Sequence, residues 1–233
     1  MNCSLTPPQK IRILRNVFRK YKNKSDLFIV DIGGTISYYS ILDSIFDSKN
    51  FFILNNCIDV LGNKSIHGDA CCLPFKDSSI DIVLSLDLIE HLASPDDFLS
   101  ESVRVLKNNG MLIISTPNLS DFYSRIAFLF GFTPFSYNPS KYRVAVPFSK
   151  LESNMGHKSV FTHKGLEELL NLYGFRKIKS YGYAYVDSFY LELNPEIRKR
   201  QAGFYNIRKL LNLFLPHSMR EGIIYIYAKK GPI

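Results

Sequence analysis

Short apolar runs recur along the chain and alternate with segments of mixed polarity. The runs at 27–34 (LFIVDIGG) and 79–86 (SIDIVLSL) are nearly continuous, as in strands buried on both faces of a parallel sheet. Similar runs predict five further strands, at 51–54, 65–70, 111–116, 176–186 and 222–230. Because helical patterns lie between several of these strands, the pattern favours an α/β fold with a mostly parallel sheet.

Helices are predicted where apolar residues return every three or four positions. The segments 37–46, 95–107 and 162–175 have this spacing. Asn109 and Gly110 follow the second segment and are expected to end its helix, since both residues favour the turn that terminates a helix.

A further helix is expected over residues 9–22, ahead of the first strand. Its apolar positions share one face and are Ile11, Leu14, Val17, Phe18 and Tyr21. Its basic positions, which begin at Lys10, are expected on the opposite face, toward solvent. We therefore expect the basic N-terminal segment, residues 1–26, to pack on the sheet through its apolar face.

Two segments interrupt the alternation of strands and helices. Residues 118–156 are rich in aromatic side chains and are broken by glycine and proline, which predicts an irregular lid over a binding site. Residues 187–218 form a second irregular insert, which is basic and aromatic. We expect a single domain over residues 1–233, with one half at 27–117 and the other at 157–233.

Composition indicates a globular chain with a core of ordinary size. Of its 233 residues, 46% are hydrophobic and 14% are aromatic. Its four cysteines include the adjacent Cys71 and Cys72 but no pair at zinc-binding spacing, which is typical of a protein in a reducing interior. No apolar run approaches the roughly 20 residues that cross a bilayer. A cytoplasmic location is therefore expected.

Charge changes this picture at two places. Lys and Arg outnumber Asp and Glu by 29 to 21, and the excess is concentrated at 10–24 and Arg198–Arg200. One interpretation is a solvated helix face, and the other is reversible, peripheral attachment to an anionic membrane surface. No motif for specific recognition of nucleic acid accompanies the basic residues. The sequence leaves the number of subunits open.

Polar residues and glycines gather where the first predicted strands end. Asp31, Gly33 and Gly34 close the first strand, Asn55 follows the second, and Asp69 lies at the end of the third. The carboxyl ends of parallel strands meet at one edge of a sheet, where ligands bind. Glycines let a ligand approach the backbone, and carboxylate or amide oxygens can accept hydrogen bonds from ribose and adenine. This pattern indicates a nucleoside pocket.

Four segments, taken in order, resemble those of class I S-adenosylmethionine-dependent methyltransferases of the methyltransferase type 11 kind. They are VDIGG, GDACCLPFKDSSIDIVLSLDLIEHL, VLKNNGMLIISTPN and GHKSVFTHKGLEELLNLYGF, within residues 27–180. The resemblance implies a Rossmann-like sheet of seven strands, the last antiparallel, with helices on both faces. It also implies S-adenosylmethionine (SAM) as the cofactor, bound by the half at 27–117, with the half at 157–233 on the substrate side.

The resemblance assigns cofactor-binding roles to Asp31, Gly33, Gly34, Asn55, Asp69, Ala70 and Leu86. The glycines would lie against the methionine end of SAM and Asn55 against the ribose. Asp69 would meet the adenine amine, with Ala70 and Leu86 beside the ring. The chain departs from the family at 35–37, where a further glycine is usual, and at Asn55, where an acid is usual.

Asp87, Glu90 and His91 follow the fourth strand at a spacing that places them on one side of a helical turn. Ubiquinone-biosynthesis O-methyltransferases resemble this group with a Mg²⁺ site, whereas many relatives use these positions only to shape the pocket rim. We expect no metal. His91 is either the general base, because its ordinary pKa lies near neutrality, or a structural histidine. His157 would face the acceptor or anchor the lid.

The expected activity is transfer of a methyl group from SAM to an oxygen, nitrogen or carbon atom of a small-molecule acceptor. The aromatic insert favours an aromatic or apolar acceptor. The alternative is a non-catalytic protein of the same fold, with a degenerate SAM site, that acts as a scaffold or partner. A nicotinamide-binding fold is disfavoured, because Gly-x-Gly-x-x-Gly is absent after Val30.

Overall fold

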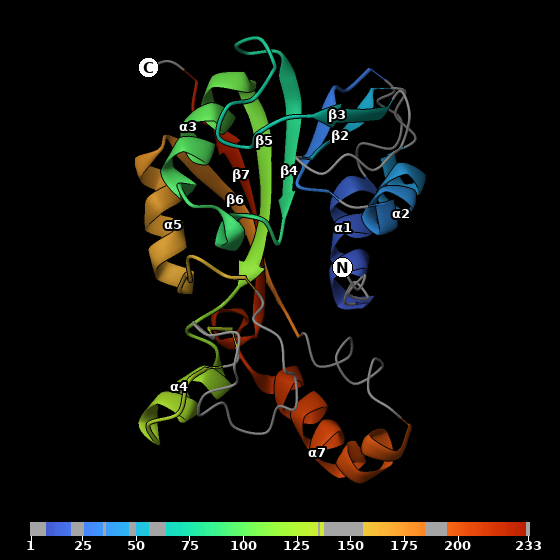
Figure 1. Ribbon diagram of the computed structural model, residues 1–233, viewed down its shortest axis with the longest axis vertical. Helices are drawn as coiled ribbons and strands as arrows, with labels where there is room; N and C mark the ends of the chain where they lie inside the picture. Colours follow the sequence, from blue (N-terminus) through green and yellow to red (C-terminus); the bar gives the residue numbers. More distant parts are fainter. Residues whose placement is uncertain are drawn as a thin grey trace.

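A seven-stranded sheet forms the centre of the computed structural model, with the strand order β3-β2-β1-β4-β5-β7-β6 (Figure 1). The structure describes residues 8–19, 26–34, 36–46, 50–55, 64–134, 136–137, 156–184 and 195–231. The strands are β1 (Ile29–Ile32), β2 (Phe51–Asn55), β3 (Ser65–His67), β4 (Ile80–Leu86), β5 (Leu106–Pro117), β6 (Phe175–Tyr183) and β7 (Gly222–Lys229). β7 runs antiparallel to β5 and β6, and the other neighbouring pairs are parallel. The predicted sheet is confirmed.

Helices cover both faces of this sheet, as expected (Figure 1). One face carries α1 (Pro8–Phe18) and α2 (Ile36–Phe46), and the other carries α3 (Pro95–Val105) and α5 (His163–Leu172). Each pair buries its own apolar cluster against the strands. Leu14 and Leu42 belong to one cluster, and Phe98 and Leu166 belong to the other. Burial of these faces, more than helix propensity, holds the layers together.

β5 begins at Leu106, directly after α3, and not at residue 111 as predicted. The pairing of β4 with β5 shifts register near the start of both strands, and Asn109 has a positive φ of 62°. A Cβ on Gly110 would lie 2.8 Å from a backbone carbonyl oxygen, so this position requires glycine. Asn109 and Gly110 therefore form an irregularity within β5. The prediction that they end the helix is wrong.

The two segments predicted to be irregular each contain a helix. α4 (Phe122–Leu129) begins after Asp121, whose carboxylate accepts hydrogen bonds from two backbone N–H groups of the first turn. α7 (Pro195–Phe214) extends over 20 residues. The prediction is wrong for both helices, because aromatic residues and a single glycine inside a segment do not prevent a helix that packs well. Residues 138–155 lie outside the described part, so closure of a lid there stays a prediction.

α4 and α7 lie at the same end of the molecule, beyond the carboxyl end of β5 (Figure 1). The hydroxyl of Tyr123 on α4 donates to the carbonyl oxygen of Arg208 on α7 over 3.3 Å, and the Arg208 guanidinium lies 4.4 Å from the Tyr123 ring centroid. Arg208 also pairs with Glu221, just before β7. Both helices are thus attached near the edge of the sheet where the nucleoside pocket is expected. None of the helices in the described ranges is long and apolar enough to span a membrane.

Over Pro8–Phe18, α1 follows its predicted amphipathic pattern except at one position, and the predicted face residue Tyr21 lies outside the described residues. Leu14 and Phe18 are buried, and Arg12 and Arg15 are exposed. Lys10, however, is completely buried. Its prediction as part of the solvated basic face is wrong, because a periodic pattern does not reveal an acidic partner that lies elsewhere in the chain.

Candidate active site

A turn of two glycines follows β1. Gly33 has a φ of 78°, which glycine adopts without strain, and its N–H donates to the carbonyl oxygen of Leu54 over 2.8 Å. A Cβ on Gly34 would lie 2.4 Å from Oδ2 of Asp31. Backbone conformation at Gly33 and lack of space at Gly34 therefore both demand glycine.

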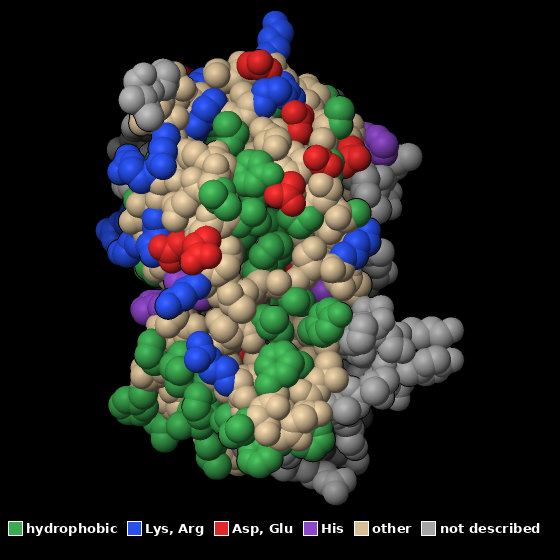
Figure 2. Space-filling model, turned by 90° about the vertical axis from the view of Figure 1, so that its left-hand side faces the viewer, with side chains coloured by type: hydrophobic (Ala, Val, Ile, Leu, Met, Phe, Trp, Pro, Cys, Tyr) green, Lys and Arg blue, Asp and Glu red, His purple; other side chains and the backbone are tan. Residues whose placement is uncertain are grey.

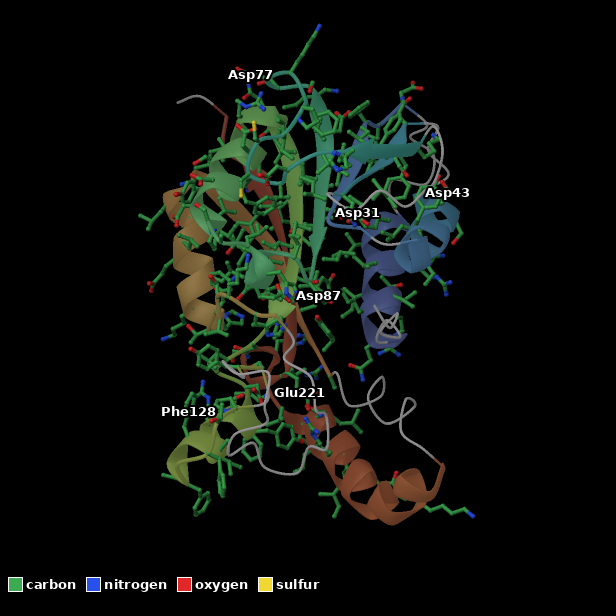
Figure 3. All side chains as sticks on the ribbon, in the orientation of Figure 1. Asp31, Asp43, Asp77, Asp87, Phe128 and Glu221 are labelled. Carbon is green, nitrogen blue, oxygen red and sulfur yellow. The ribbon has the colours of Figure 1, made fainter. Side chains whose placement is uncertain are left out.

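Asp31 is a buried carboxylate near the end of β1. It lies on the side of the sheet that α1 and α2 cover (Figure 3). It is 1% exposed, and neither carboxylate oxygen has a hydrogen-bond partner among the described residues. Burial raises the pKa of Asp31 to about 7, against the opposing effect of the positive charge on Lys10. Such a group is stabilised by a ligand that donates hydrogen bonds to it.

A small cavity of about 70 Å³ opens beside the glycine turn. It brings together four of the predicted cofactor-binding residues, namely Gly33, Asn55, Asp69 and Ala70. Nδ2 of Asn55 donates to the carbonyl oxygen of Gly34 over 2.9 Å, and Oδ1 of Asp69 accepts from the N–H of Cys71 over 2.9 Å. These hydrogen bonds to the backbone orient the two polar side chains at the cavity.

Leu86 does not line this cavity. Because side chains of a strand alternate between the two faces, Leu86 packs with Leu84 in the cluster under α1 and α2. Leu88 and Leu92 line it in place of Leu86, together with Ile32 and Leu54, and Cδ1 of Leu88 would lie 2.7 Å from a Cβ on Gly33. Leu88 and Leu92 could not be predicted, because they belong to the irregular connection between β4 and α3, where no periodicity applies.

Asp87 lies directly after β4, close to the end of β5 (Figure 3). The side chains that bind it include three from the described residues. Nζ of Lys10 is 2.5 Å from its Oδ2, and the hydroxyls of Ser115 and Tyr183 donate to its Oδ1 over 2.9 and 3.2 Å. Lys10, Ser115 and Tyr183 come from α1, β5 and β6. No sequence signal links them, since they meet only when the sheet and α1 are assembled. Asp87 is thus already neutralised by a lysine.

Glu90 lies in the short 3₁₀ helix η3 (Ile89–His91). It is 1% exposed, and neither of its carboxylate oxygens has a hydrogen-bond partner among the described residues. Burial, and after it the charge of Asp87, raises the pKa of Glu90 to about 8. The carbonyl oxygen of Glu90 accepts from the N–H groups of residues 158–159 over 2.7 and 3.0 Å, which holds the second half of the chain against η3.

His91 lies against His157, with ring centroids 4.9 Å apart in an edge-to-face arrangement. Nδ1 of His91 is 3.2 Å from the carbonyl oxygen of Gly156, and Nδ1 of His157 is 2.7 Å from that of Ser136. Since a carbonyl oxygen only accepts, each Nδ1 carries a proton, and in the neutral form of the ring Nε2 then carries the lone pair. Burial lowers the pKa of His157, which favours this neutral form.

The fold and this arrangement define a class of protein. An open parallel sheet with a glycine turn after β1, and with polar residues at the ends of β2 and β3, is the nucleoside-binding edge of a class I methyltransferase fold. Residues 53–114 match the model of the methyltransferase domain family. The chain has the fold of the class I SAM-dependent methyltransferases, whose cofactor is SAM, and is similar to them in sequence over part of its length.

Individual relatives agree with this assignment. The chain is 44% identical over 52 residues to a "Probable S-adenosylmethionine-dependent methyltransferase" of Mycolicibacterium smegmatis, over 22% of this chain and 20% of that one. A SAM-dependent methyltransferase from Archaeoglobus fulgidus has a TM-score of 0.56 at 19% identity, over 94% of both chains. The cyclase SpnF has a TM-score of 0.58 at 14% identity, over 99% of this chain and 85% of that one.

These similarities establish the fold, and the reaction requires its own argument. Matched segments span only 20% and 46% of the lengths of two curated relatives. A protein named as a cyclase shares the fold, so the fold alone does not define the chemistry. The described residues do fit SAM, since Asp31 offers an unpaired buried carboxylate and any side chain at Gly33 or Gly34 would crowd the turn.

Proposed function

We propose that the protein transfers the methyl group of SAM to an oxygen, nitrogen or carbon atom of a small apolar or aromatic acceptor. The observation that carries this proposal is that one segment, residues 87–92, contributes to both the cavity and the histidine pair. Leu88 and Leu92 line the cavity, whereas Glu90 and His91 meet His157. A cofactor in the cavity and an acceptor at the histidines would therefore be neighbours, as in-line methyl transfer requires.

The cavity residues would hold the nucleoside part of SAM. Nδ2 of Asn55 donates to the carbonyl oxygen of Gly34 beside the cavity, and the side-chain carbonyl oxygen of Asn55 would accept from a ribose hydroxyl. Asp69 would accept from the adenine amine, and Ala70 and Leu88 would contact the ring. Asp31 and the glycine turn would meet the methionine end, where the bound cofactor supplies a methyl group on a positively charged sulfur.

His91 is the proposed general base. Its Nδ1 proton faces the carbonyl oxygen of Gly156, so Nε2 has the lone pair that can take a proton from the acceptor. A base is needed only where the attacking atom must lose a proton. The remaining catalytic effect comes from alignment of the two reactants and from exclusion of water.

Calorimetry and product detection test this proposal. SAM and its demethylated product should bind saturably, and the product should accumulate with at least one acceptor from a panel of phenols, amines and activated carbon acids. No binding at millimolar SAM would favour the alternative of a non-catalytic scaffold. Saturable binding of SAM without methyl transfer to any acceptor would support the cofactor site but reject the proposed class of acceptor.

Peripheral attachment to a membrane is the second proposal, and exposed apolar side chains support it. α4 and the turn after it expose Phe128, Leu129 and Phe130, and α7 exposes Leu213 and Phe214. Leu129 is 79% exposed and Phe214 is 80% exposed. Figure 2 shows apolar side chains gathered at the end of the molecule where α4 and α7 lie in Figure 1. Soluble monomers rarely expose so many large apolar side chains in one region without a partner surface.

The charge of α7 suits an anionic bilayer as that partner. The sequence of this helix holds Arg198, Lys199, Arg200 and Lys209 against the single acid Glu196, whereas Arg208 is paired with Glu221. Each basic residue near such a surface contributes about 1 kcal/mol, and salt weakens the attraction. Attachment at this end of the sheet would bring an apolar acceptor from the lipid phase to His91.

Co-sedimentation with vesicles containing phosphatidylglycerol tests the attachment. The protein should pellet at low salt and be released as salt rises. Leu213→Asp combined with Phe214→Asp should abolish pelleting, because both side chains would lose their place in the lipid interface. Leu172→Asp is the matched control, since Leu172 is 83% exposed but lies on α5. A wild-type protein that stays in the supernatant at low salt would reject the attachment.

A further inference from the structure

We propose that Glu90, His91 and His157 bind a divalent transition-metal ion. Each residue offers one ligand atom, and these three atoms lie within 4.8 Å of one another. Two imidazole nitrogens with one carboxylate oxygen suit zinc and its first-row neighbours. Mg²⁺ and Ca²⁺ prefer sites composed of oxygen ligands alone.

The surroundings of the two histidines are those of metal ligands. Imidazoles that bind a metal almost always donate their other ring N–H to a carbonyl or carboxylate, which fixes the ring and its tautomer. His91 does so toward the carbonyl oxygen of Gly156, and His157 toward that of Ser136. In the neutral form of each ring, Nε2 is then the nitrogen left to bind a metal.

Glu90 supplies the third, independent observation. It is 1% exposed, and among the described residues neither carboxylate oxygen has a hydrogen bond of ordinary geometry, although the Thr116 side chain is close enough to lower the pKa of Glu90. A buried carboxylate without hydrogen bonds or an ion pair is costly to keep in a fold. Asp87 beside it is neutralised by Lys10, whereas no salt bridge to Glu90 occurs in the described ranges. A cation between Glu90 and the histidines would satisfy this carboxylate.

The distances allow such a site after a small closure. Ligand atoms around a tetrahedral zinc ion lie about 3.4 Å apart. The present separation of up to 4.8 Å therefore has to shrink by at most about 1.5 Å, which side-chain rotation can supply. Three protein ligands leave at least one coordination position for water or for an atom of a small ligand.

This ligand set differs from the Asp87, Glu90 and His91 group, for which the sequence resembles a Mg²⁺ site but no metal was expected. Asp87 already binds Lys10, Ser115 and Tyr183. In the proposed set of metal ligands, His157 therefore stands in the position of Asp87. If the methyl acceptor occupies the open coordination position, the metal would act as a Lewis acid and lower the pKa of the acceptor. His91 would then serve as a metal ligand and would no longer act as a free base. That consequence rests on the proposed function, whereas metal binding itself does not.

Calorimetric titration of the full chain, freed of metal by a chelator, tests the proposal. We expect one Zn²⁺ per chain, and at least 100-fold weaker binding of Mg²⁺. Glu90→Gln and His157→Gln should each weaken Zn²⁺ affinity at least tenfold. His67→Gln should leave the affinity unchanged, because His67 is exposed on β3. Co²⁺ should produce a visible absorption band in the wild-type protein that Zn²⁺ displaces.

Two outcomes overturn the proposal: no stoichiometric Zn²⁺ binding by the wild-type chain, or equal Zn²⁺ affinity in the wild type and both ligand variants. Should the variants not fold, ring nitrogen resonances of the wild-type protein decide the matter. Zn²⁺ must shift Nε2 of His91 and His157, and unshifted resonances overturn the proposal. SAM affinity measured with and without metal is a separate readout, so failure of the metal site and failure of the cofactor site are distinguishable.

Discussion

Nζ of Lys10 lies 2.5 Å from Oδ2 of Asp87, although 77 positions separate the two residues in the chain. Lys10 is completely buried on α1, and the side chain of Asp87 is 25% exposed after β4. A buried lysine needs an opposite charge, and Asp87 provides it. The ion pair therefore attaches the N-terminal helix to residues 87–92, which line the cavity and carry His91. α1 is in this sense part of the site.

Lys10→Met should destabilise the protein by about 1–3 kcal/mol, because it leaves Asp87 without its cation. The loss stays at the lower end of the range for buried pairs, since Asp87 is partly exposed and keeps its bonds to Ser115 and Tyr183. Urea denaturation measures the loss. Arg12→Met, on the exposed face of the same helix, should change stability by less than about 0.5 kcal/mol. Equal effects of the two substitutions would contradict a role for the ion pair.

Asp31→Asn should change how stability depends on pH in the ligand-free protein. Burial raises the pKa of Asp31 from 3.8 to about 7, so between these values the folded state holds a proton that the unfolded state has released. Wild-type stability therefore falls as pH rises through this window, by at most about 1.4 kcal/mol per pH unit, and levels off above it. The asparagine variant does not titrate here.

Thermal unfolding of both proteins across this pH window checks the expectation for Asp31. The variant should gain stability relative to the wild type as pH rises, and the difference should be constant in alkaline buffer. Asp77→Asn, at an exposed acid, serves as the control and should show no such trend. Parallel pH profiles of the wild type and Asp31→Asn would mean that Asp31 titrates normally.

Asp69→Ala should weaken SAM binding by about 1–3 kcal/mol, because it removes the carboxylate assigned to the adenine amine. Isothermal titration calorimetry measures the change. Asp77→Ala is a matched control, since it removes another exposed acid from the connection between β3 and β4 that does not line the cavity. Unchanged affinity in a folded Asp69→Ala protein would remove Asp69 from the cofactor site.

Gly33→Val should abolish SAM binding. Gly33 has a φ of 78°, and even a Cβ at this position would lie 2.7 Å from Leu88, so a branched side chain must displace the cavity wall. Equilibrium binding of labelled SAM provides the measurement. Gly203→Ala in α7, where a Cβ meets nothing within 4 Å, should bind SAM as the wild type does. Normal binding by Gly33→Val would place the cofactor elsewhere.

The strands and the helices on the two faces could be predicted from local pattern. Strand β4 was expected at 79–86 and is observed at Ile80–Leu86, because a strand buried on both faces must be a continuous apolar run. α7 could not be recognised in this way. Its apolar positions Leu213 and Phe214 are largely exposed, so the one-sided burial that normally creates a helical pattern is weak there.

The part of the candidate site that is assigned to the cofactor also follows from the sequence alone. Gly33, Asn55 and Asp69 each close a strand, and parallel strands bring their carboxyl ends to one edge whatever the details of packing. The order of residues along the chain therefore determines that glycine, amide and carboxylate groups lie at the edge of the pocket.

Only the tertiary structure decided which side chains face one another there. His91 meets His157 across 66 positions, and Lys10 meets Asp87 across 77, because α1 and the segment after residue 155 pack against the end of β4. The alternation of β4 turns Leu86 away from the cavity and leaves Leu88 to form its wall. The physical reason is that strand order follows from short-range pattern, whereas contacts between distant side chains depend on the register and packing of elements that no local pattern records.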